Sequence, residues 1–399
     1  MPNIGTNPKN LSMSMNNRAL VMSGVKDYGH NLKFASMTLR NDREIAIAAV
    51  RNCGSSIMHV STTLREDRGF ILDAVRVHFY GFKYASETLR DDHEVCLAAV
   101  TNDGYALRYA SEKLRDDREI VLTAVRNNGH ALEYASGSLR DDRDIVLAAV
   151  AFDGHALAFA SSTLMNDREV VMAAVTIGES FELFHINDGL RYASETLRND
   201  REIVQIAVMN TYDALDYVTD AMRNDHEIVM LAVNANGHAL KYASVTLKKD
   251  RSIVLAAVST HGSSLVHSDV TLRNDREIVM VAMRNDANAL SFASTALRND
   301  REIVLVAVRN NGLALKWASA TLMNDREIVL AAVDNRRMAI AYCPGLDRRI
   351  RCDKSLVRPG PRHALLLLRR LPLSVSLPDE LCVIIASFIE SERLMYSPS

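Results

Sequence analysis

The chain has 399 residues, of which 48% are hydrophobic but only 6% aromatic, and its formal net charge is −2. The apolar fraction excludes a disordered chain, and five cysteines are too few for a disulfide scaffold. The near-neutral charge gives no general attraction to nucleic acid or anionic membranes. No apolar run approaches the roughly 20 residues of a membrane span, and no secretory signal pattern opens the chain. We therefore expect an intracellular protein, cytoplasmic or nuclear, with no membrane association.

The N-terminal residues and the distribution of prolines give the first boundaries. Residues 1–16 form a polar N-terminal tail. Two of the eight prolines stand at positions 2 and 8, and the other six at position 344 or later, so residues 9–343 contain none. A stretch of this length without proline, rich in Ala, Leu and Val, predicts helix throughout.

A repeat fills this proline-free stretch. Asp-Arg-Glu-Ile or a close variant recurs every 25 residues, except for one longer step between Asp167 and Asp200, and a degenerate first copy begins at Asn17. A period of 20–50 residues is typical of solenoids. We predict an all-α fold, an α-solenoid of about thirteen 25-residue helix-turn-helix repeats over residues 17–343 with a C-terminal helical tail. The other copies begin at Asp42, Asp67, Asp92, Asp117, Asp142, Asp167, Asp200, Asp225, Asp250, Asp275, Asp300 and Asp325.

One clean copy, residues 117–136, shows the expected elements. The first helix is capped either by Asp116, in a capping box with Glu119, or by Asp117. It runs for about eleven residues, and Gly129 ends it in the left-handed conformation. A second, shorter helix directs Leu132 and the aromatic residue two positions later to the same side. Two such helices cannot bury their apolar faces alone, so neighbouring copies must stack.

The repeat pattern Gly-x-Ala-Leu-x-Tyr-Ala-Ser-x-x-Leu-Arg-x-Asp-Arg-Glu-Ile-Val resembles an uncharacterised helical repeat family. That family is described only as a domain of unknown function and is frequent in protists and large DNA viruses. The resemblance covers residues 17–343. It implies an α-solenoid and supplies no activity.

Arginine and histidine recur at fixed places in the repeat. The pair Arg115 and Arg118 is interleaved with acidic residues, which favours a salt-bridged seam between repeats over a nucleic-acid surface. Histidines follow the glycine in four copies, but stacked copies about 10 Å apart are too widely spaced to converge on a metal ion. We expect no metal site and no cofactor. Because phosphate-loop, dinucleotide and hydrolase motifs are missing, we also expect no enzyme. The four histidines are His30, His130, His155 and His238.

Departures from the repeat are candidate binding features. Eight extra residues fall within residues 177–188 and bring Phe181 and Phe184 into a loop position. Insertions in repeat proteins often map to the binding face, although this one could also close a local packing defect. Three aromatic residues, Phe79, Tyr80 and Tyr105, add bulk that either extends the core or forms an exposed patch.

The C-terminal region differs in composition. Residues 336–370 carry ten Lys and Arg against two Asp, a net charge of +8, so the rest of the chain carries −10. We assign residues 344–376 to a basic, proline-containing linker, which folds back on the repeats, binds an anionic partner or acts as a localisation signal.

Residues 377–399 are predicted to form an amphipathic helix, and their sequence is similar to the opening of an F-box. In that family the matching residues dock on the adaptor of a cullin-RING ubiquitin ligase. The match is confined to residues 377–389 and so corresponds to a truncated F-box, and the alternative is a helix that caps the last repeat. The matching residues are Leu377, Pro378, Glu380, Leu381, Ile385, Ser387, Phe388 and Ile389.

Two functions follow as hypotheses. The first is a protein–protein interaction scaffold that binds a partner along the solenoid, in its sharper form as a substrate-recruiting adaptor of a ubiquitin ligase. The second is a structural rod or assembly subunit without that role. Nucleic-acid binding by the basic linker is the least favoured interpretation.

Overall fold

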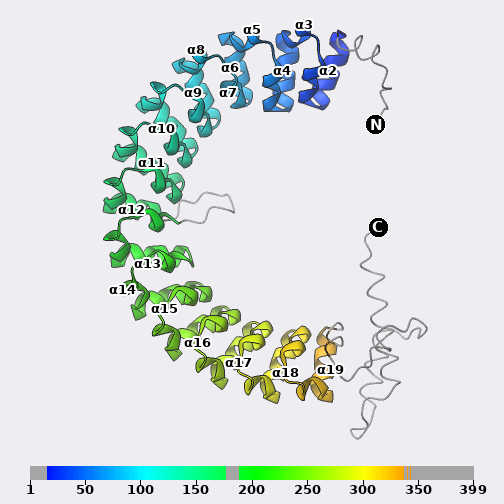
Figure 1. Cartoon of the computed structure of the whole chain (residues 1–399), viewed down its shortest axis with the longest axis vertical. Coiled ribbons are helices and arrows are strands. Elements are labelled where there is room, and N and C mark those ends of the chain that lie inside the picture. The colour runs from blue at the N-terminus through cyan, green and yellow to red at the C-terminus, as the bar shows by residue number, and fades with distance from the viewer. Residues whose placement is uncertain (1–15, 177–187, 337–338, 340–341, 343–399) are drawn as a thin grey trace, which may run out of the picture. The chain divides into compact units, whose positions relative to one another are not determined.

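The computed structural model describes residues 16–176, 188–336, 339 and 342, and these residues form helices and turns with no strand. The predicted all-α repeat fold is confirmed. The chain divides into two compact units, unit 1 (Met1–Thr211) and unit 2 (Tyr212–Ser399). In Figure 1 the long helices of each unit lie side by side in chain order.

Each repeat opens with a long α-helix, and the described residues contain thirteen of them, as the sequence predicts. We number repeat positions from the aspartate or asparagine that precedes this helix, so that Asp117 and its equivalents are position 1. The positions that follow the insertion are counted back from Tyr192 at position 18. The long helices of unit 1 are α2 (Arg18–Asp27), α4 (Arg43–Asn52), α6 (Arg68–Val77), α9 (His93–Asn102), α10 (Arg118–Asn127), α11 (Arg143–Phe152), α12 (Arg168–Val175) and α13 (Arg201–Asn210). Those of unit 2 are α15 (His226–Ala235), α16 (Arg251–Thr260), α17 (Arg276–Asn285), α18 (Arg301–Asn310) and α19 (Arg326–Asn335).

The second element of the repeat is a 3₁₀-helix in nearly every copy. In unit 1 these segments are η1 (Gly29–Phe34), η2 (Gly54–His59), α7 (Tyr80–Lys83), η3 (Gly104–Tyr109), η5 (Gly129–Tyr134), η7 (Gly154–Phe159) and η9 (Gly189–Tyr192). In unit 2 they are η11 (Ala214–Asp216), η12 (Gly237–Tyr242), η14 (Gly262–His267), η16 (Ala287–Phe292) and η18 (Gly312–Trp317).

A third short turn of helix, which the sequence did not predict, completes each of the first twelve repeats. In unit 1 it is α3 (Met37–Arg40), α5 (Thr62–Arg65), α8 (Glu87–Arg90), η4 (Leu114–Asp116), η6 (Leu139–Asp141), η8 (Leu164–Asn166) or η10 (Leu197–Asn199). In unit 2 it is α14 (Asp220–Arg223), η13 (Leu247–Lys249), η15 (Leu272–Asn274), η17 (Leu297–Asn299) or η19 (Leu322–Asn324).

The long helix is capped by the aspartate at position 1. Asp117 Oδ1 accepts hydrogen bonds from the backbone N–H groups of Glu119 (3.0 Å) and Ile120 (3.1 Å). Asp116 instead accepts from the hydroxyl groups of Ser136 and Ser138 in the next repeat. Of the two caps that the sequence allows, Asp117 is correct and the capping box of Asp116 is wrong.

The core lies between the long helices and the 3₁₀-helices. In α10 the four side chains Ile120, Val121, Ala124 and Val125 are fully buried, at positions 4, 5, 8 and 9, and Leu132 of η5 is fully buried too. This stripe is the apolar face that stacking must cover. The aromatic residue at position 18 is only half-buried, so the expectation that it points the same way as Leu132 is wrong.

Gly129, at position 13, lies in a closely packed contact with the next repeat. Asn128, with φ −152°, ends α10, and Gly129 starts η5 outside the left-handed region, so the predicted left-handed cap is wrong. A Cβ on Gly129 would lie 2.5 Å from the carbonyl oxygen of Ala149 in the next long helix. Glycine therefore lets η5 approach the backbone of α11.

Hydrogen bonds to backbone groups also connect neighbouring repeats. The N–H of Ser136 donates to the carbonyl oxygen of Arg115 at 2.9 Å. Asn127, at position 11, donates its Nδ2 to the carbonyl oxygen of Thr101 (3.1 Å) and accepts from the N–H of Gly104 (2.8 Å). These bonds satisfy helix-terminal groups that would otherwise lack partners, and they fix the register between repeats.

The predicted seam of salt bridges is confirmed for the arginine at position 2. Arg68 Nε lies 2.8 Å from Asp92 Oδ2, and its Nη2 lies 2.6 Å from Glu94 Oε2, both in the next repeat. The other arginine of the pair does not join the seam, because Arg40 donates to the carbonyl oxygens of Lys33 and Ala35 in its own repeat. The arginines that pair with carboxylates of the next repeat include Arg18, Arg43, Arg68, Arg118, Arg143, Arg168, Arg251, Arg276 and Arg301.

This seam predicts a loss of stability in acid. The hydrogen bond from Arg18 holds the pKa of Asp42 below its ordinary value, and Arg68 does the same for Asp92. The unfolded chain binds these protons more readily, so the stabilising contribution is complete above about pH 4 and lost as the pH falls through the lower folded-state values. The melting temperature, followed by circular dichroism from pH 7 to pH 2, should fall below about pH 4. The loss should be smaller in Asp42→Asn with Asp92→Asn, and an identical acid dependence in that variant would contradict the assignment.

Candidate functional site

Within each unit, the described side chains at positions 14, 17 and 18 of the repeats form a surface along the second helical elements. We call this the aromatic surface. Position 18 of one repeat contacts position 14 of the preceding repeat: the rings of Tyr105 and Tyr134 are 6.2 Å apart, and those of His130 and Phe159 are 5.9 Å apart. A 3₁₀-helix has three residues per turn, so positions 14 and 17 lie on one edge.

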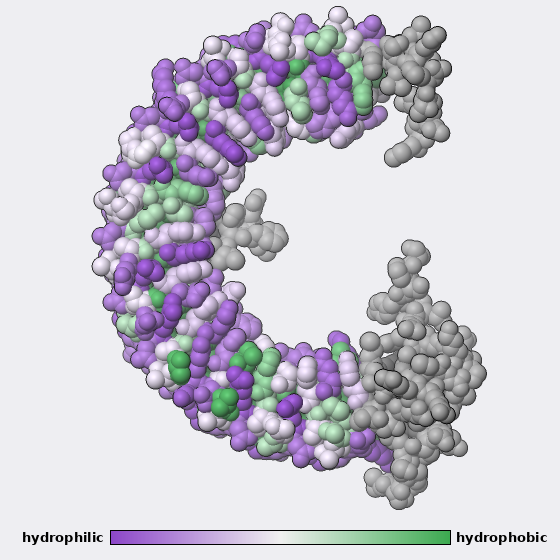
Figure 2. Space-filling model, in the orientation of Figure 1, coloured by the Kyte–Doolittle hydropathy of each residue, from purple (hydrophilic) through white to green (hydrophobic). Residues whose placement is uncertain are grey.

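Exposed apolar side chains concentrate on and beside this surface. Phe34 and Met58 are each 48% exposed, Tyr105 is 40% exposed and Trp317 36%. On the long helices, by contrast, the large apolar side chains that are this exposed among the described residues are Leu20, Phe152 and Met209. The space-filling view shows much of the visible surface as hydrophilic, with separate hydrophobic patches (Figure 2). Exposed aromatic area of this kind is typical of protein-binding surfaces.

Cationic side chains cover several of these rings. Lys316 Nζ lies 4.8 Å from the ring centre of Trp317, and Lys83 Nζ lies 5.2 Å from Tyr84 and 5.6 Å from Tyr109 in the next repeat. Cation–π contacts hold the aromatic rings and the long cationic chains in place without neutralising the positive charge. The surface thus offers flat apolar rings edged by ammonium and guanidinium groups.

Histidines at position 14 pair with groups in the next repeat. His130 Nε2 lies 2.9 Å from Oδ2 of the buried Asp153, and His155 Nδ1 lies 2.9 Å from Asp188 Oδ1. The rings of His130 and His155 stack with centres 5.1 Å apart, so histidine side chains of adjacent repeats lie closer than the expected spacing of the repeats. Within the described parts of the chain, no three His, Cys, Asp or Glu side chains converge as metal ligands would.

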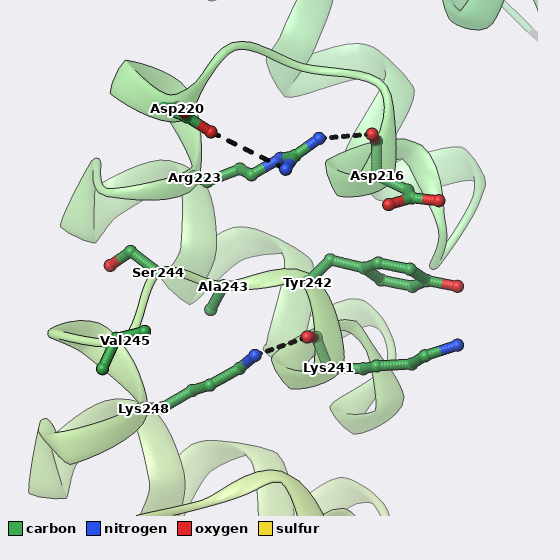
Figure 3. A pocket seen from close by; sticks show the side chains of 9 residues that line it. All are labelled: Asp216, Asp220, Arg223, Lys241, Tyr242, Ala243, Ser244, Val245 and Lys248. Atoms are coloured by element: carbon green, nitrogen blue, oxygen red, sulfur yellow. Dashed lines mark hydrogen bonds and ion pairs between the residues drawn. The ribbon is translucent and has the colours of Figure 1, made fainter.

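A pocket of about 400 Å³ lies in unit 2 between the repeat of α14 and the repeat of η12. Figure 3 shows Arg223 reaching from α14 toward the backbone of Asp216, and Lys248 reaching toward the backbone of Lys241. Lys248 Nζ donates to the Lys241 carbonyl oxygen at 2.6 Å, and burial lowers the pKa of this lysine. The lining residues are Asp216, Asp220, Arg223, Lys241, Tyr242, Ala243, Ser244, Val245 and Lys248.

The structure places the aromatic departures from the repeat on the surface of unit 1. Phe79 and Tyr80 are half-buried and stack with ring centres 4.5 Å apart, and Tyr105 is exposed. Of the three, Tyr105 is therefore a surface residue, whereas Phe79 and Tyr80 are partly covered. The two residues of the insertion, Phe181 and Phe184, lie outside the described residues.

The predicted partner-binding residues of the C-terminal motif also lie outside the described residues. These are Leu377, Pro378, Glu380, Leu381, Ile385, Phe388 and Ile389. Among the described helices, none is both long and apolar enough to cross a membrane.

These stacked two-layer repeats define the chain as an α-solenoid protein. It belongs to the DUF4116 family, a domain of unknown function, whose model matches nine overlapping or adjoining segments between residues 17 and 348. The matched segments are residues 17–65, 67–115, 92–140, 117–151, 142–188, 183–223, 225–273, 250–298 and 300–348. A comparison with curated proteins and a comparison with solved structures each gave no match.

Proposed function

We propose that this protein is a non-enzymatic interaction scaffold that binds a protein partner through the aromatic surface. The observation that supports this is the gathering of exposed Phe, Tyr, Trp and Met side chains with unneutralised cations along the 3₁₀-helices. Aromatic side chains and arginine contribute most to protein–protein binding, and aromatic rings bury large areas at low entropic cost.

The salt-bridge seam is a poorer candidate for the binding surface. Its arginines already bind carboxylates of the next repeat, as Arg118 does with Asp142 and Asp144. A partner would have to replace these pairs before it gained contacts of its own. Lys83 and Lys316, in contrast, lie over aromatic rings and have no carboxylate partner among the described residues.

Charge reversal on the two surfaces tests this proposal. Lys83→Glu, Arg108→Glu and Lys316→Glu change the aromatic surface, and Arg51→Glu, Arg126→Glu and Arg309→Glu make the same charge change at exposed positions of the long helices. Proteins captured from the source cell by the unaltered chain should be retained by the long-helix variant and lost from the aromatic-surface variant, as measured by quantitative mass spectrometry. Equal capture by both variants would contradict the proposal.

A sharper form of the proposal makes the chain a substrate-recruiting adaptor of a cullin-RING ubiquitin ligase. It is supported by the F-box-like residues 377–389, which lie outside the described residues. Purified ligase adaptor should bind the full chain and not the variant Leu381→Asp with Ile385→Asp. If the adaptor binds both the unaltered chain and the variant, or binds neither of them, the ubiquitin-ligase role is excluded. The scaffold proposal would then still stand.

A further inference from the structure

Two repeats carry histidine in place of the aromatic residue at position 18, one in each unit. Both follow a repeat with histidine at position 14, lysine at position 17 and arginine or lysine at position 24. Histidine also stands at position 14 in the repeats of His130 and His155. Position 17 of these repeats is Glu133 or Ala158, which carry no positive charge, and position 18 of the next repeat is aromatic. We call the first set cluster 1 and the second cluster 2. Cluster 1 is His30, Lys33, Arg40 and His59, and cluster 2 is His238, Lys241, Lys248 and His267.

The two clusters share a further local sequence. Their second repeats begin the 3₁₀-helix with Gly-Ser-Ser, at residues 54–56 and 262–264, where most other repeats have alanine as the third residue. Ser56 and Ser264 are fully buried, and the Oγ of each has no hydrogen-bond partner. Ser56 Oγ lies against Gly29, because a Cβ built on that glycine would be 2.6 Å from it, and Gly29 directly precedes His30. A buried hydroxyl without a partner is costly unless a ligand or water binds it.

Cluster 1 is closely packed. His30 Nδ1 lies 3.3 Å from His59 Nε2, and the Oγ of Ser55 lies 3.1 Å from His30 Nε2. The Sγ of Cys53 lies 3.4 Å from the same nitrogen. The donors of two adjacent repeats therefore meet at one place.

Cluster 2 holds the matching repeat positions in unit 2, and its two lysines line the pocket there. His238 is 4.7 Å from the ring of His261, which occupies the position of Cys53. Lys241 and Lys248 line the pocket with Val245, an apolar residue that is 72% exposed (Figure 3). The matching residue beside cluster 1, Met37, is 67% exposed.

Both clusters hold concentrated positive charge. No member has an ion pair with a carboxylate among the described residues, although Asp216 and Asp220 line the same pocket as Lys241 and Lys248. Burial lowers the pKa of His59, and the other members of cluster 1 lower it further. Burial is also the largest cause that lowers the pKa of His267. The other members of cluster 2 and Arg273 lower it further. Mutual repulsion of this kind is relieved when an anion binds.

We propose that clusters 1 and 2 are two equivalent binding sites, one in each unit, for the phosphate group of a phosphorylated peptide. Each cluster offers a lysine, a second basic side chain and two imidazoles, which matches a group with a charge close to −2 and three acceptor oxygens better than a single carboxylate. The exposed Met37 and Val245 give an apolar contact for a residue near the phosphate. That the phosphate belongs to a peptide rests on the proposed scaffold function, whereas phosphate binding itself does not.

Calorimetric titration of the full chain at pH 7 tests the sites, with inorganic phosphate, a short phosphoserine peptide with an adjacent leucine, and the same peptide without phosphate as probes. We expect binding of the first two, the phosphopeptide tighter, and none of the third. His59→Gln with His267→Gln should weaken binding at least about tenfold, the loss of one charge-assisted hydrogen bond.

His93→Gln with His226→Gln is the matched control, because these two histidines stand at position 2 of the seam, one in each unit. It should bind both phosphate probes like the unaltered chain. Unchanged phosphate affinity in the cluster variant would overturn the sites. Phosphate binding at the clusters without a gain from the phosphopeptide would overturn the peptide as its source, and the charge-reversal experiment would still decide the scaffold function.

Discussion

Gly129→Ala is expected to destabilise unit 1 by about 1–3 kcal/mol, the usual effect of overpacking a closely packed contact. The added Cβ would meet the Ala149 carbonyl oxygen, a backbone atom that cannot rotate away, so α11 and η5 must separate. The effect should appear as lower urea resistance of the full chain. Hydrogen exchange should locate it in the repeats of α10 and α11.

Gly137→Ala is the matched control in the same repeat. A Cβ at Gly137 meets no atom within 4 Å, and its backbone lies outside the left-handed region. This variant should be as stable as the unaltered chain or up to about 1 kcal/mol more stable, because alanine restricts the unfolded chain. Equal destabilisation by the two substitutions would show that close packing is not the reason for glycine at position 13.

Ile120→Ala is expected to cost about 2–5 kcal/mol, the range for removing most of a fully buried side chain. Ile120 is fully buried in the stripe between adjacent long helices, so the cavity affects two interfaces. Ile120→Val should cost about 0.5–1.5 kcal/mol. Met37→Ala, at a side chain that is 67% exposed, should change the free energy of unfolding by less than about 0.5 kcal/mol. Urea unfolding of the three variants measures the order of these losses in stability. A small effect of Ile120→Ala would mean that the buried stripe of α10 is not the core.

The sequence predicts the repeats well because their signals are local. Thirteen copies, the start of each long helix and the pairing of Arg68 with the acids of the next copy all follow from the 25-residue spacing and the order of charges. The choice between Asp116 and Asp117 as cap could not be made from the sequence, since both precede the helix and both accept hydrogen bonds in the structure.

Glycine and histidine show where sequence reasoning fails. Gly129 sits where a left-handed cap is common, and only the nearness of Ala149 in the next repeat reveals the real reason. His59 and His267 stand at position 18 in place of the aromatic residue, but the spacing alone does not show that His59 contacts His30. These partners are separated by more than one repeat length in the sequence, because position 14 meets position 18 of the next repeat.

The Asn127 contacts were missed for a similar reason. An asparagine at the end of a helix is expected at a turn, and nothing in one copy shows that it binds Thr101 and Gly104 of the copy before it. Its recurrence at position 11, in Asn52, Asn285 and Asn335, was the available signal.

Site-specific photo-crosslinking in the source cell tests most directly whether the aromatic surface binds a partner. Benzoylphenylalanine would replace Trp317 on the aromatic surface, which is 36% exposed, or Phe152 at the end of α11, which is 37% exposed. We predict a protein adduct from position 317 and none from position 152. Adducts from neither position, or from position 152 alone, would contradict binding through the aromatic surface and favour the structural rod.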